Sequence, residues 1–248
     1  MAKGNVTDDA TRIGLHDKSA IVFGGTGTIG AEIVAELLES GCRVAIASRG
    51  IHSTTALMER IARHSERLDF IKADVSVESQ VKNAFELARD LWSKIDFLVY
   101  SPGLTPDVEL PLSRYPATAW SNNIDIYVTG FLYCFQESMQ KLQRGAHIVA
   151  ISSAVTRFST ESLPPFEAGH YAACKAALNE LCKWGRREAH QHGVLLSRLA
   201  PGAVESVTQR FLPGPPEKRR VISVRAVAEK IVEALQSGVE IDRELFPE

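Results

Sequence analysis

Residues 19–30 read SAIVFGGTGTIG, a short apolar run followed by a glycine-rich turn and the beginning of a helical pattern. The first five residues show no alternation of polar and apolar side chains, which is typical of a parallel strand covered by helices on both faces. Gly25, Gly27 and Gly30 then follow the spacing GxGxxG. Such glycines allow a tight bend and a close approach of the backbone to a pyrophosphate, whose charge a helix N-terminus favours. We therefore predict a dinucleotide-binding loop; the alternative is a turn that serves the fold alone.

The rest of the chain continues this alternation of strand and helix. Apolar runs of four or five residues predict strands over Ser19–Phe23, Arg43–Ala47, Leu68–Lys72, Phe97–Tyr100, His147–Ile151 and Leu195–Leu199. Helical periodicity predicts helices over Ile29–Ser40, Ile51–His64, Val77–Trp92, Pro116–Leu142, Tyr171–Gln191 and Arg225–Gln236. This order predicts an α/β fold, a doubly wound parallel sheet of the Rossmann type with helices on both faces. Ligands of such sheets bind at the carboxyl ends of the strands, so we expect the functional residues in the loops that follow them.

The composition favours one domain and argues against several classes of function. The 248 residues are 45% hydrophobic, and we expect a single domain over residues 1–248 with an N-terminal extension at 1–17. A formal net charge of −2 gives no reason to expect nucleic acid or an anionic membrane as a partner. The polar N-terminus and the lack of about 20 uninterrupted apolar residues predict a cytoplasmic protein. The four cysteines show no metal-ligand spacing, so we expect buried thiols and no metal site.

The end of the second predicted strand indicates which dinucleotide binds. Folds that take NAD carry an acidic residue here, about 20 residues beyond the glycine loop, for the ribose hydroxyls. This chain has Ser48 and Arg49 instead. A guanidinium can clamp the 2′-phosphate of NADP, with the Ser48 hydroxyl as a second donor, whereas a carboxylate would repel it. We predict NADP(H) as the cofactor; the alternative for Arg49 is a solvated side chain at the start of a loop.

A second motif lies at the start of the helix predicted from residue 171. Tyr171 and Lys175 form Tyr-x-x-x-Lys, and side chains four residues apart on a helix lie on the same face. An adjacent ammonium favours the phenolate, so we expect Lys175 to lower the pKa of Tyr171 toward the working range of an acid-base group. Ser153 follows the fifth predicted strand, where its hydroxyl can bond a substrate carbonyl. The three residues predict proton transfer to or from a carbonyl or alcohol.

From residue 18 to residue 206 the chain resembles the short-chain dehydrogenase/reductase family, because Ser153, Tyr171 and Lys175 follow the glycine loop in that family's order. The resemblance implies hydride transfer between C4 of a nicotinamide and a carbonyl carbon. It further implies that Tyr171 moves the proton, that Lys175 holds the nicotinamide ribose and tunes Tyr171, and that Ser153 orients the carbonyl.

Two further motifs extend the resemblance to the cofactor site. Asp74 with Val75 resembles the family's contact to adenine, and the segment from Pro201 to Ser206 resembles its Pro-Gly segment beside the nicotinamide carboxamide. The expected cofactor-binding residues are Gly24, Thr26, Gly27, Thr28, Ile29, Gly30, Ser48, Arg49, Asp74, Val75, Ser101, Gly103, Tyr171, Lys175, Pro201, Gly202, Val204 and Ser206.

Three segments depart from the family pattern. The glycine loop has Phe23 in place of a threonine and Thr28 in place of the middle glycine. Residues 100–103 read YSPG where the family usually has NNAG. Tyr127 stands at the position of the family's catalytic asparagine, so the proton relay that this asparagine supports is either rerouted or absent.

Two loops remain to recognise a substrate. The loop Ala154–His170 is longer than is usual in the family, and its Phe158 and Phe166 either line the pocket or belong to a surface loop. The resemblance implies that the loop Val207–Val221 is a reduced substrate lid, whose basic residues either bind an anionic carrier group or face solvent.

The expected function is that of an NADPH-dependent carbonyl reductase, with alcohol oxidation as the reverse reaction. One alternative is a non-redox isomerase or dehydratase with Tyr171 as base. Another is a dinucleotide-sensing protein with little turnover, which Tyr127 favours and the intact Ser153, Tyr171 and Lys175 disfavour. The helices predicted over Pro116–Leu142 and Tyr171–Gln191 carry apolar or small residues on more than one face, and the resemblance implies that they pair in a homodimer or homotetramer.

Overall fold

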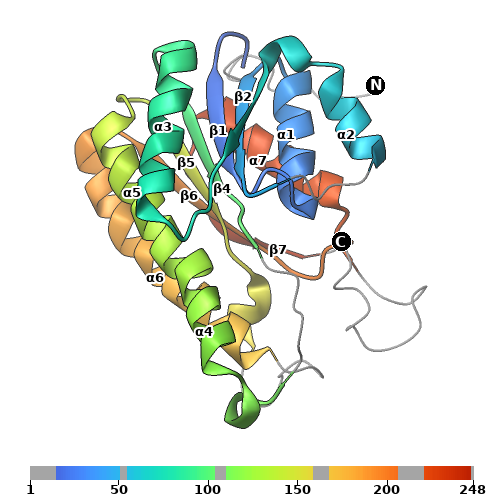
Figure 1. Cartoon of the computed structure of the whole chain (residues 1–248), viewed down its shortest axis with the longest axis vertical. Coiled ribbons are helices and arrows are strands. Elements are labelled where there is room, and N and C mark those ends of the chain that lie inside the picture. Colours follow the sequence, from blue (N-terminus) through green and yellow to red (C-terminus); the bar gives the residue numbers. More distant parts are fainter. Residues whose placement is uncertain (1–14, 51–54, 104–109, 159–167, 206–220, 247–248) are drawn as a thin grey trace, which may run out of the picture.

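A computed structural model describes residues 15–50, 55–103, 110–158, 168–205 and 221–246. These residues form a seven-stranded parallel sheet in the order β3-β2-β1-β4-β5-β6-β7 (Figure 1). The chain moves outward from β1 to β3, crosses to β4, and then moves outward to β7, so the topological switch point lies between β1 and β4. The predicted doubly wound parallel sheet is confirmed. The strands are β1 (Ser19–Phe23), β2 (Arg43–Ser48), β3 (Leu68–Lys72), β4 (Phe97–Tyr100), β5 (His147–Ile151), β6 (Leu195–Pro201) and β7 (Asp242–Leu245).

Strand β7 was not predicted, whereas β1 to β6 begin where the apolar runs begin. Three of its four residues are charged, so no apolar run indicates it. It pairs with β6 through the backbone at the edge of the sheet, and Asp242 accepts a hydrogen bond from Arg186 (2.8 Å) and forms an ion pair with Arg198. Tertiary ion pairs thus stabilise a strand that local hydrophobicity does not specify.

The helices form one layer on each face of the sheet: α1, α2 and α7 cover one face, and α3, α5 and α6 cover the other (Figure 1). Successive residues of a strand point to opposite faces, so Val22 belongs to the core under α1 and α7 while Ile21 and Phe23 belong to the core under α3 and α5. The helices are α1 (Thr28–Glu39), α2 (Thr55–Ala62), α3 (Glu78–Trp92), α4 (Ala117–Ile124), α5 (Gly130–Lys141), α6 (Gly169–His192) and α7 (Val224–Ser237), and 3₁₀ turns occupy Ser65–Arg67, Leu112–Arg114 and Ala154–Arg157.

The helix predicted over Pro116–Leu142 is confirmed for residues 117–141, but it contains a π turn at Asp125–Thr129, between α4 and α5, that the sequence did not predict. The Gly130 N–H donates to the Asp125 carbonyl, five residues earlier, and not to the Ile126 carbonyl, which an α-helix would use. A single extra residue in one turn leaves the apolar periodicity almost unchanged, so the sequence pattern does not indicate it. π turns are frequent at functional sites, and this one carries Tyr127.

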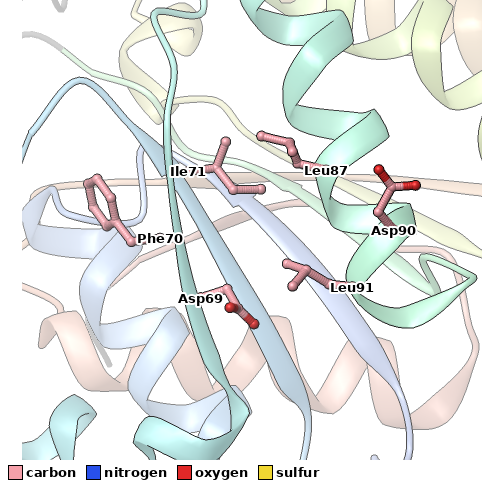
Figure 2. A pocket seen from close by; sticks show the side chains of 6 residues that line it. All are labelled: Asp69, Phe70, Ile71, Leu87, Asp90 and Leu91. Atoms are coloured by element: carbon pink, nitrogen blue, oxygen red, sulfur yellow. The ribbon is translucent and has the colours of Figure 1, made fainter.

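A shallow groove lies between β3 and α3 (Figure 2). Strand β3 is the edge of the sheet, and β2 and β1 separate it from β4, so the groove is remote from the switch point. The groove is lined by Asp69, Phe70, Ile71, Leu87, Asp90 and Leu91.

In the part of the chain that the structure describes, none of the helices is both long enough and apolar enough to span a membrane.

Candidate active site

The glycine loop joins β1 directly to α1. A hydrogen bond from the Gly27 N–H to the Gly24 carbonyl closes its turn (3.0 Å), and α1 begins at Thr28. A Cβ atom at Gly30 would lie 2.1 Å from the Gly24 carbonyl oxygen, so this position accepts only glycine. Gly27 and Thr28 are exposed, and the first N–H groups of a helix have no acceptor within it. The N-terminus of α1 is therefore open to an anionic ligand.

Ser48, the last residue of β2, and Arg49, which follows it, differ in whether they are available to a bound ligand. The Ser48 hydroxyl donates to the Gly50 carbonyl (3.1 Å) and lies 2.7 Å from the Thr26 hydroxyl. Ser48 and Thr26 are both buried, and their contact ties the β2 loop to the glycine loop. Arg49 is exposed at the same edge. Because the Ser48 proton is used inside the protein, Arg49 is the group of this pair that is available to a phosphate.

The loop after β3 holds Asp74 in a fixed orientation. Its carboxylate accepts hydrogen bonds from the Ser76 N–H (3.0 Å) and the Ser76 hydroxyl (2.7 Å). The Asp74 N–H donates to the Gln80 side chain (2.8 Å), which joins the loop to α3. Val75 is buried beneath the loop, so it supports the backbone beside Asp74.

The loop after β4 lies against the glycine loop. The Ser101 N–H donates to the Phe23 carbonyl at the end of β1 (3.0 Å). Gly103 is exposed, and the position of a Cβ atom on it would lie 3.9 Å from the Tyr127 hydroxyl oxygen. The β4 loop thus connects the glycine loop to the π turn that carries Tyr127.

The structure brings the three predicted catalytic residues together at the carboxyl end of β5. Ser153 follows β5, and its hydroxyl acts on Tyr171, the third residue of α6, by lowering the pKa of the phenol. Lys175 lies one helical turn further along α6 and is buried. Its ammonium donates to the carbonyl of Ile151, the last residue of β5 (2.8 Å).

Two tyrosine rings surround the Lys175 ammonium. Its Nζ lies 4.6 Å from the ring centroid of Tyr127 and 5.6 Å from that of Tyr171. The two rings are themselves in contact edge to face, with centroids 5.5 Å apart and planes at 73°. Tyr127 is therefore part of the site, although its type differs from the residue expected there.

Burial determines the protonation of Tyr171 and Lys175. It raises the pKa of Tyr171 to about 12, against the hydrogen bond with Ser153, which lowers it. Burial also lowers the pKa of Lys175 to about 7, against the thiols of Cys182 and Cys174, which raise it. The prediction that the pKa of Tyr171 is lowered is therefore wrong for this structure, since burial of the phenol outweighs the lowering by its hydroxyl neighbour. Tyr171 keeps its proton at neutral pH.

A polar network behind the site was not predicted. The Ser152 hydroxyl donates to the Asn179 side-chain oxygen, and the Asn179 amide donates to the Thr156 hydroxyl (3.2 Å). Thr156 in turn donates to the Ser153 carbonyl (3.1 Å). Asn179 lies four residues beyond Lys175 and thus on the same face of α6, a spacing from which the sequence could have identified it.

The segment after β6 is described only in part. Pro201 ends β6, and the Gly202 N–H donates to the Leu245 carbonyl of β7 (2.7 Å), so this amide is used inside the protein. Val204 is buried and pairs with Ile222. The described residues contain no group of His, Cys, Asp and Glu able to hold a metal ion. Three predicted features lie outside the described residues: Phe166, Ser206 and residues 207–220 of the predicted lid.

Comparisons with solved structures agree on the fold. A short-chain dehydrogenase/reductase from Serratia marcescens superposes with a TM-score of 0.80 at 20% sequence identity, over 94% of this chain and 98% of that one. A short-chain dehydrogenase from Burkholderia cenocepacia, solved in complex with NADP, superposes with a TM-score of 0.79 at 21% identity, over the same shares.

Comparisons of sequence identify the family. An uncharacterized oxidoreductase of Staphylococcus aureus strain N315 is 25% identical over 228 residues, which cover 89% of this chain and 92% of that protein. An uncharacterized oxidoreductase of Staphylococcus saprophyticus is 27% identical over 231 residues, which cover 90% and 92%. The family model of the short chain dehydrogenases matches residues 18–213, most of the chain. The chain thus belongs to the short-chain dehydrogenase/reductase family, whose members are oxidoreductases.

Proposed function

We propose that this protein is an NADPH-dependent carbonyl reductase, with oxidation of the corresponding alcohol as its reverse reaction. The observation that carries the proposal is the interacting pair Ser153 and Tyr171 with Lys175 one turn away, at the carboxyl end of a central strand. Two hydroxyl groups held together in this way can donate to the oxygen of one substrate carbonyl.

The residues present fit a nicotinamide dinucleotide. Gly30 leaves no space for a side chain between α1 and the glycine loop, and the exposed start of α1 can receive a pyrophosphate. The exposed Arg49, with no acidic residue beside it in the chain, favours the 2′-phosphate of NADP. The NADP bound to the Burkholderia cenocepacia relative lends support to this choice.

The side chains of this protein supply the proton and the orientation. A bound nicotinamide supplies the hydride that adds to the carbonyl carbon. Tyr171, protonated at neutral pH, donates its proton to the carbonyl oxygen as the C=O π bond becomes an O–H bond, so hydride and proton together convert the ketone into an alcohol. Ser153 would hold the carbonyl oxygen beside the phenol, and the Lys175 ammonium would donate a hydrogen bond to the nicotinamide ribose.

The test measures loss of NADPH absorbance with a panel of ketones, for the wild type and for Tyr171→Phe. We expect turnover in the wild type and its near-complete loss in the variant, with NADPH binding by fluorescence retained in both. Tyr133→Phe on α5, a partly buried tyrosine outside the site, is the matched control and keeps its turnover. Unchanged turnover in Tyr171→Phe would defeat the mechanism. NADPH binding without turnover on any ketone would favour a sensing role, and substrate conversion without net NADPH loss would favour an isomerase.

We further propose a single domain, a homodimer or homotetramer, and a location in the cytoplasm. The described residues of the site lie at the carboxyl ends of the strands of one sheet, which supports the single domain. Three large apolar side chains are exposed on α4, α5 and α6, which supports the oligomer: Trp120 (38%), Leu132 (39%) and Trp184 (61%). All four cysteines are free buried thiols, which fits a reducing compartment.

A further inference from the structure

We infer that Tyr127 is a positioning residue whose ring, and not whose hydroxyl, holds the Lys175 ammonium beside Tyr171. The kinetic part of this inference rests on the proposed reductase function. The structural part concerns a contact between two side chains and stands independently of what the protein reduces.

The Lys175 ammonium lies in surroundings that compensate only part of its lost hydration. The side chain is 4% exposed, and the described residues provide one hydrogen-bond acceptor, the Ile151 carbonyl. An ammonium has three donors, and burying unpaired donors is costly. The titratable groups that act on its charge, Cys174 and Cys182, are thiols whose own pKa values burial raises, so they are not anions at neutral pH.

The aromatic face of Tyr127 supplies the missing stabilisation. A cation within about 6 Å of a ring centroid is attracted by the ring quadrupole, most strongly in a desolvated site. Tyr127 is the nearer of the two rings, at 4.6 Å against 5.6 Å for Tyr171. It also packs edge to face against the Tyr171 ring. One side chain thus sets the position of both the amine and the phenol.

The backbone around Tyr127 is built to present this ring. In the π turn the Gly130 N–H bonds to Asp125, and the Ile126 carbonyl accepts the Tyr100 hydroxyl instead. A Cβ atom at Gly130 would lie 2.8 Å from both the Tyr100 hydroxyl oxygen and a methyl carbon of Val75, so glycine lets the helix approach β4 closely. Tyr100 and Gly130 therefore hold the segment on either side of Tyr127.

A ring face has no proton to exchange with the ammonium. Tyr127 consequently fixes where the charge lies without taking part in proton transfer, and removing its hydroxyl alone leaves this action intact. A lysine side chain has four rotatable bonds, so loss of the ring releases the amine from the position beside Tyr171.

The first experiment reads the contact without any turnover. Protein labelled with ¹³C at lysine Cε is observed by two-dimensional NMR, and the Lys175 signal is assigned as the one missing from Lys175→Met. We expect its Hε resonance to be displaced upfield by the ring current, and to titrate near neutral pH. The displacement persists in Tyr127→Phe. It falls to the smaller contribution of the Tyr171 ring in Tyr127→Leu and in Tyr127→Met, and two apolar replacements are used in case one of them does not fold. An unshifted Lys175 signal in the wild type overturns the inference.

The second experiment separates the ring from the hydroxyl by kinetics. For variants whose circular dichroism shows a folded protein, kcat in Tyr127→Leu and Tyr127→Met falls on the order of tenfold, with a displaced kcat–pH profile. Tyr127→Phe restores most of kcat, and Tyr133→Leu on α5 serves as the control outside the site. An equal loss in Tyr127→Phe would assign the role to the hydroxyl and overturn the inference, as would unchanged kcat and pH profile in the leucine variant. If the wild type reduces no ketone, the proposed function fails, while the NMR displacement still decides the inference.

Discussion

The hydroxyl of Tyr100, at the end of β4, donates a hydrogen bond to the backbone carbonyl of Ile126 in the π turn. Both atoms are buried, and Tyr100 also packs edge to face on Phe131 of α5 (ring centroids 5.3 Å apart). This bond satisfies a carbonyl that the π turn releases from the helical pattern. It therefore links the central sheet to the segment that carries Tyr127.

Tyr100→Phe tests this link. The substitution keeps the ring and leaves the Ile126 carbonyl buried without its donor, which costs about 1–3 kcal/mol in the free energy of unfolding. Urea denaturation measures this loss. Tyr133→Phe, on the partly buried face of α5, changes the stability by less than about 0.5 kcal/mol. Equal stabilities of the two variants would show that the Tyr100 bond contributes nothing.

Arg49→Asp tests the choice of cofactor. The exposed guanidinium attracts the 2′-phosphate of NADPH, whereas a carboxylate repels it. We expect the Kd of NADPH to increase on the order of tenfold or more and that of NADH to remain equal or decrease. Fluorescence titration with both dinucleotides measures the two constants. Arg89→Asp on α3 makes the same change in net charge at an exposed position remote from the loop and leaves the preference unchanged. A wild type that binds NADH as tightly as NADPH contradicts the prediction.

Lys175 makes the stability of the fold depend on pH. Burial lowers its pKa from 10.5 to about 7, so between these values the unfolded chain binds more protons than the folded one. The free energy of unfolding therefore includes a penalty that is complete below about pH 7 and is relieved as the pH rises toward 10.

Lys175→Met removes this dependence, because the thioether side chain does not titrate. Urea unfolding at about pH 7 and about pH 9 should show that the stability of the wild type relative to the variant increases with pH, by at most about 1.4 kcal/mol per pH unit. The thiols and Tyr171 are common to both proteins, so their titration cancels in the difference. A difference that does not change with pH contradicts the prediction.

Asn179→Leu tests the network behind Ser153. Loss of the amide removes the acceptor of Ser152 and the donor to Thr156, so the loop that carries Ser153 is no longer held. We expect kcat to fall on the order of tenfold through misplacement of the Ser153 hydroxyl, with the Kd of NADPH unchanged. Glu180→Leu, at the next position of α6 and bonded only to Lys183 among the described residues, is the control. A loss of NADPH affinity equal to the loss of kcat would indicate general damage to the site.

Trp184→Asp tests the proposed subunit contact. Trp184 is 61% exposed on α6, and a carboxylate at this position makes burial between subunits unfavourable. Light scattering should show an oligomer for the wild type and a smaller species for the variant. Leu91→Asp, at the groove between β3 and α3 (Figure 2), places the same charge at another exposed apolar position and leaves the assembly intact. A wild type that is monomeric in solution refutes the contact.

The sequence by itself determined six of the seven strands found in the described residues, the doubly wound topology, and which residues meet at the candidate site. Strands such as β1 and β5 are buried on both faces, so they appear as unbroken apolar runs. The glycine loop and Tyr-x-x-x-Lys are short motifs whose residues lie within a few positions of one another. Their spacing in the chain therefore predicts their arrangement in space.

The tertiary structure alone decided the rest. Strand β7 exists because Arg186 and Arg198 bind a charged segment that is distant in the chain. The π turn is stabilised by Tyr100, whose hydroxyl bonds to a backbone carbonyl 26 residues away in the chain. The apolar periodicity of the sequence is nearly the same with or without a π turn, so it could not predict one. The pKa values of Tyr171 and Lys175 follow from burial, which depends on every element packed around them. Local sequence patterns therefore predict which residues meet. Desolvation and long-range contacts decide the protonation states of Tyr171 and Lys175 and place the Tyr127 ring against the amine.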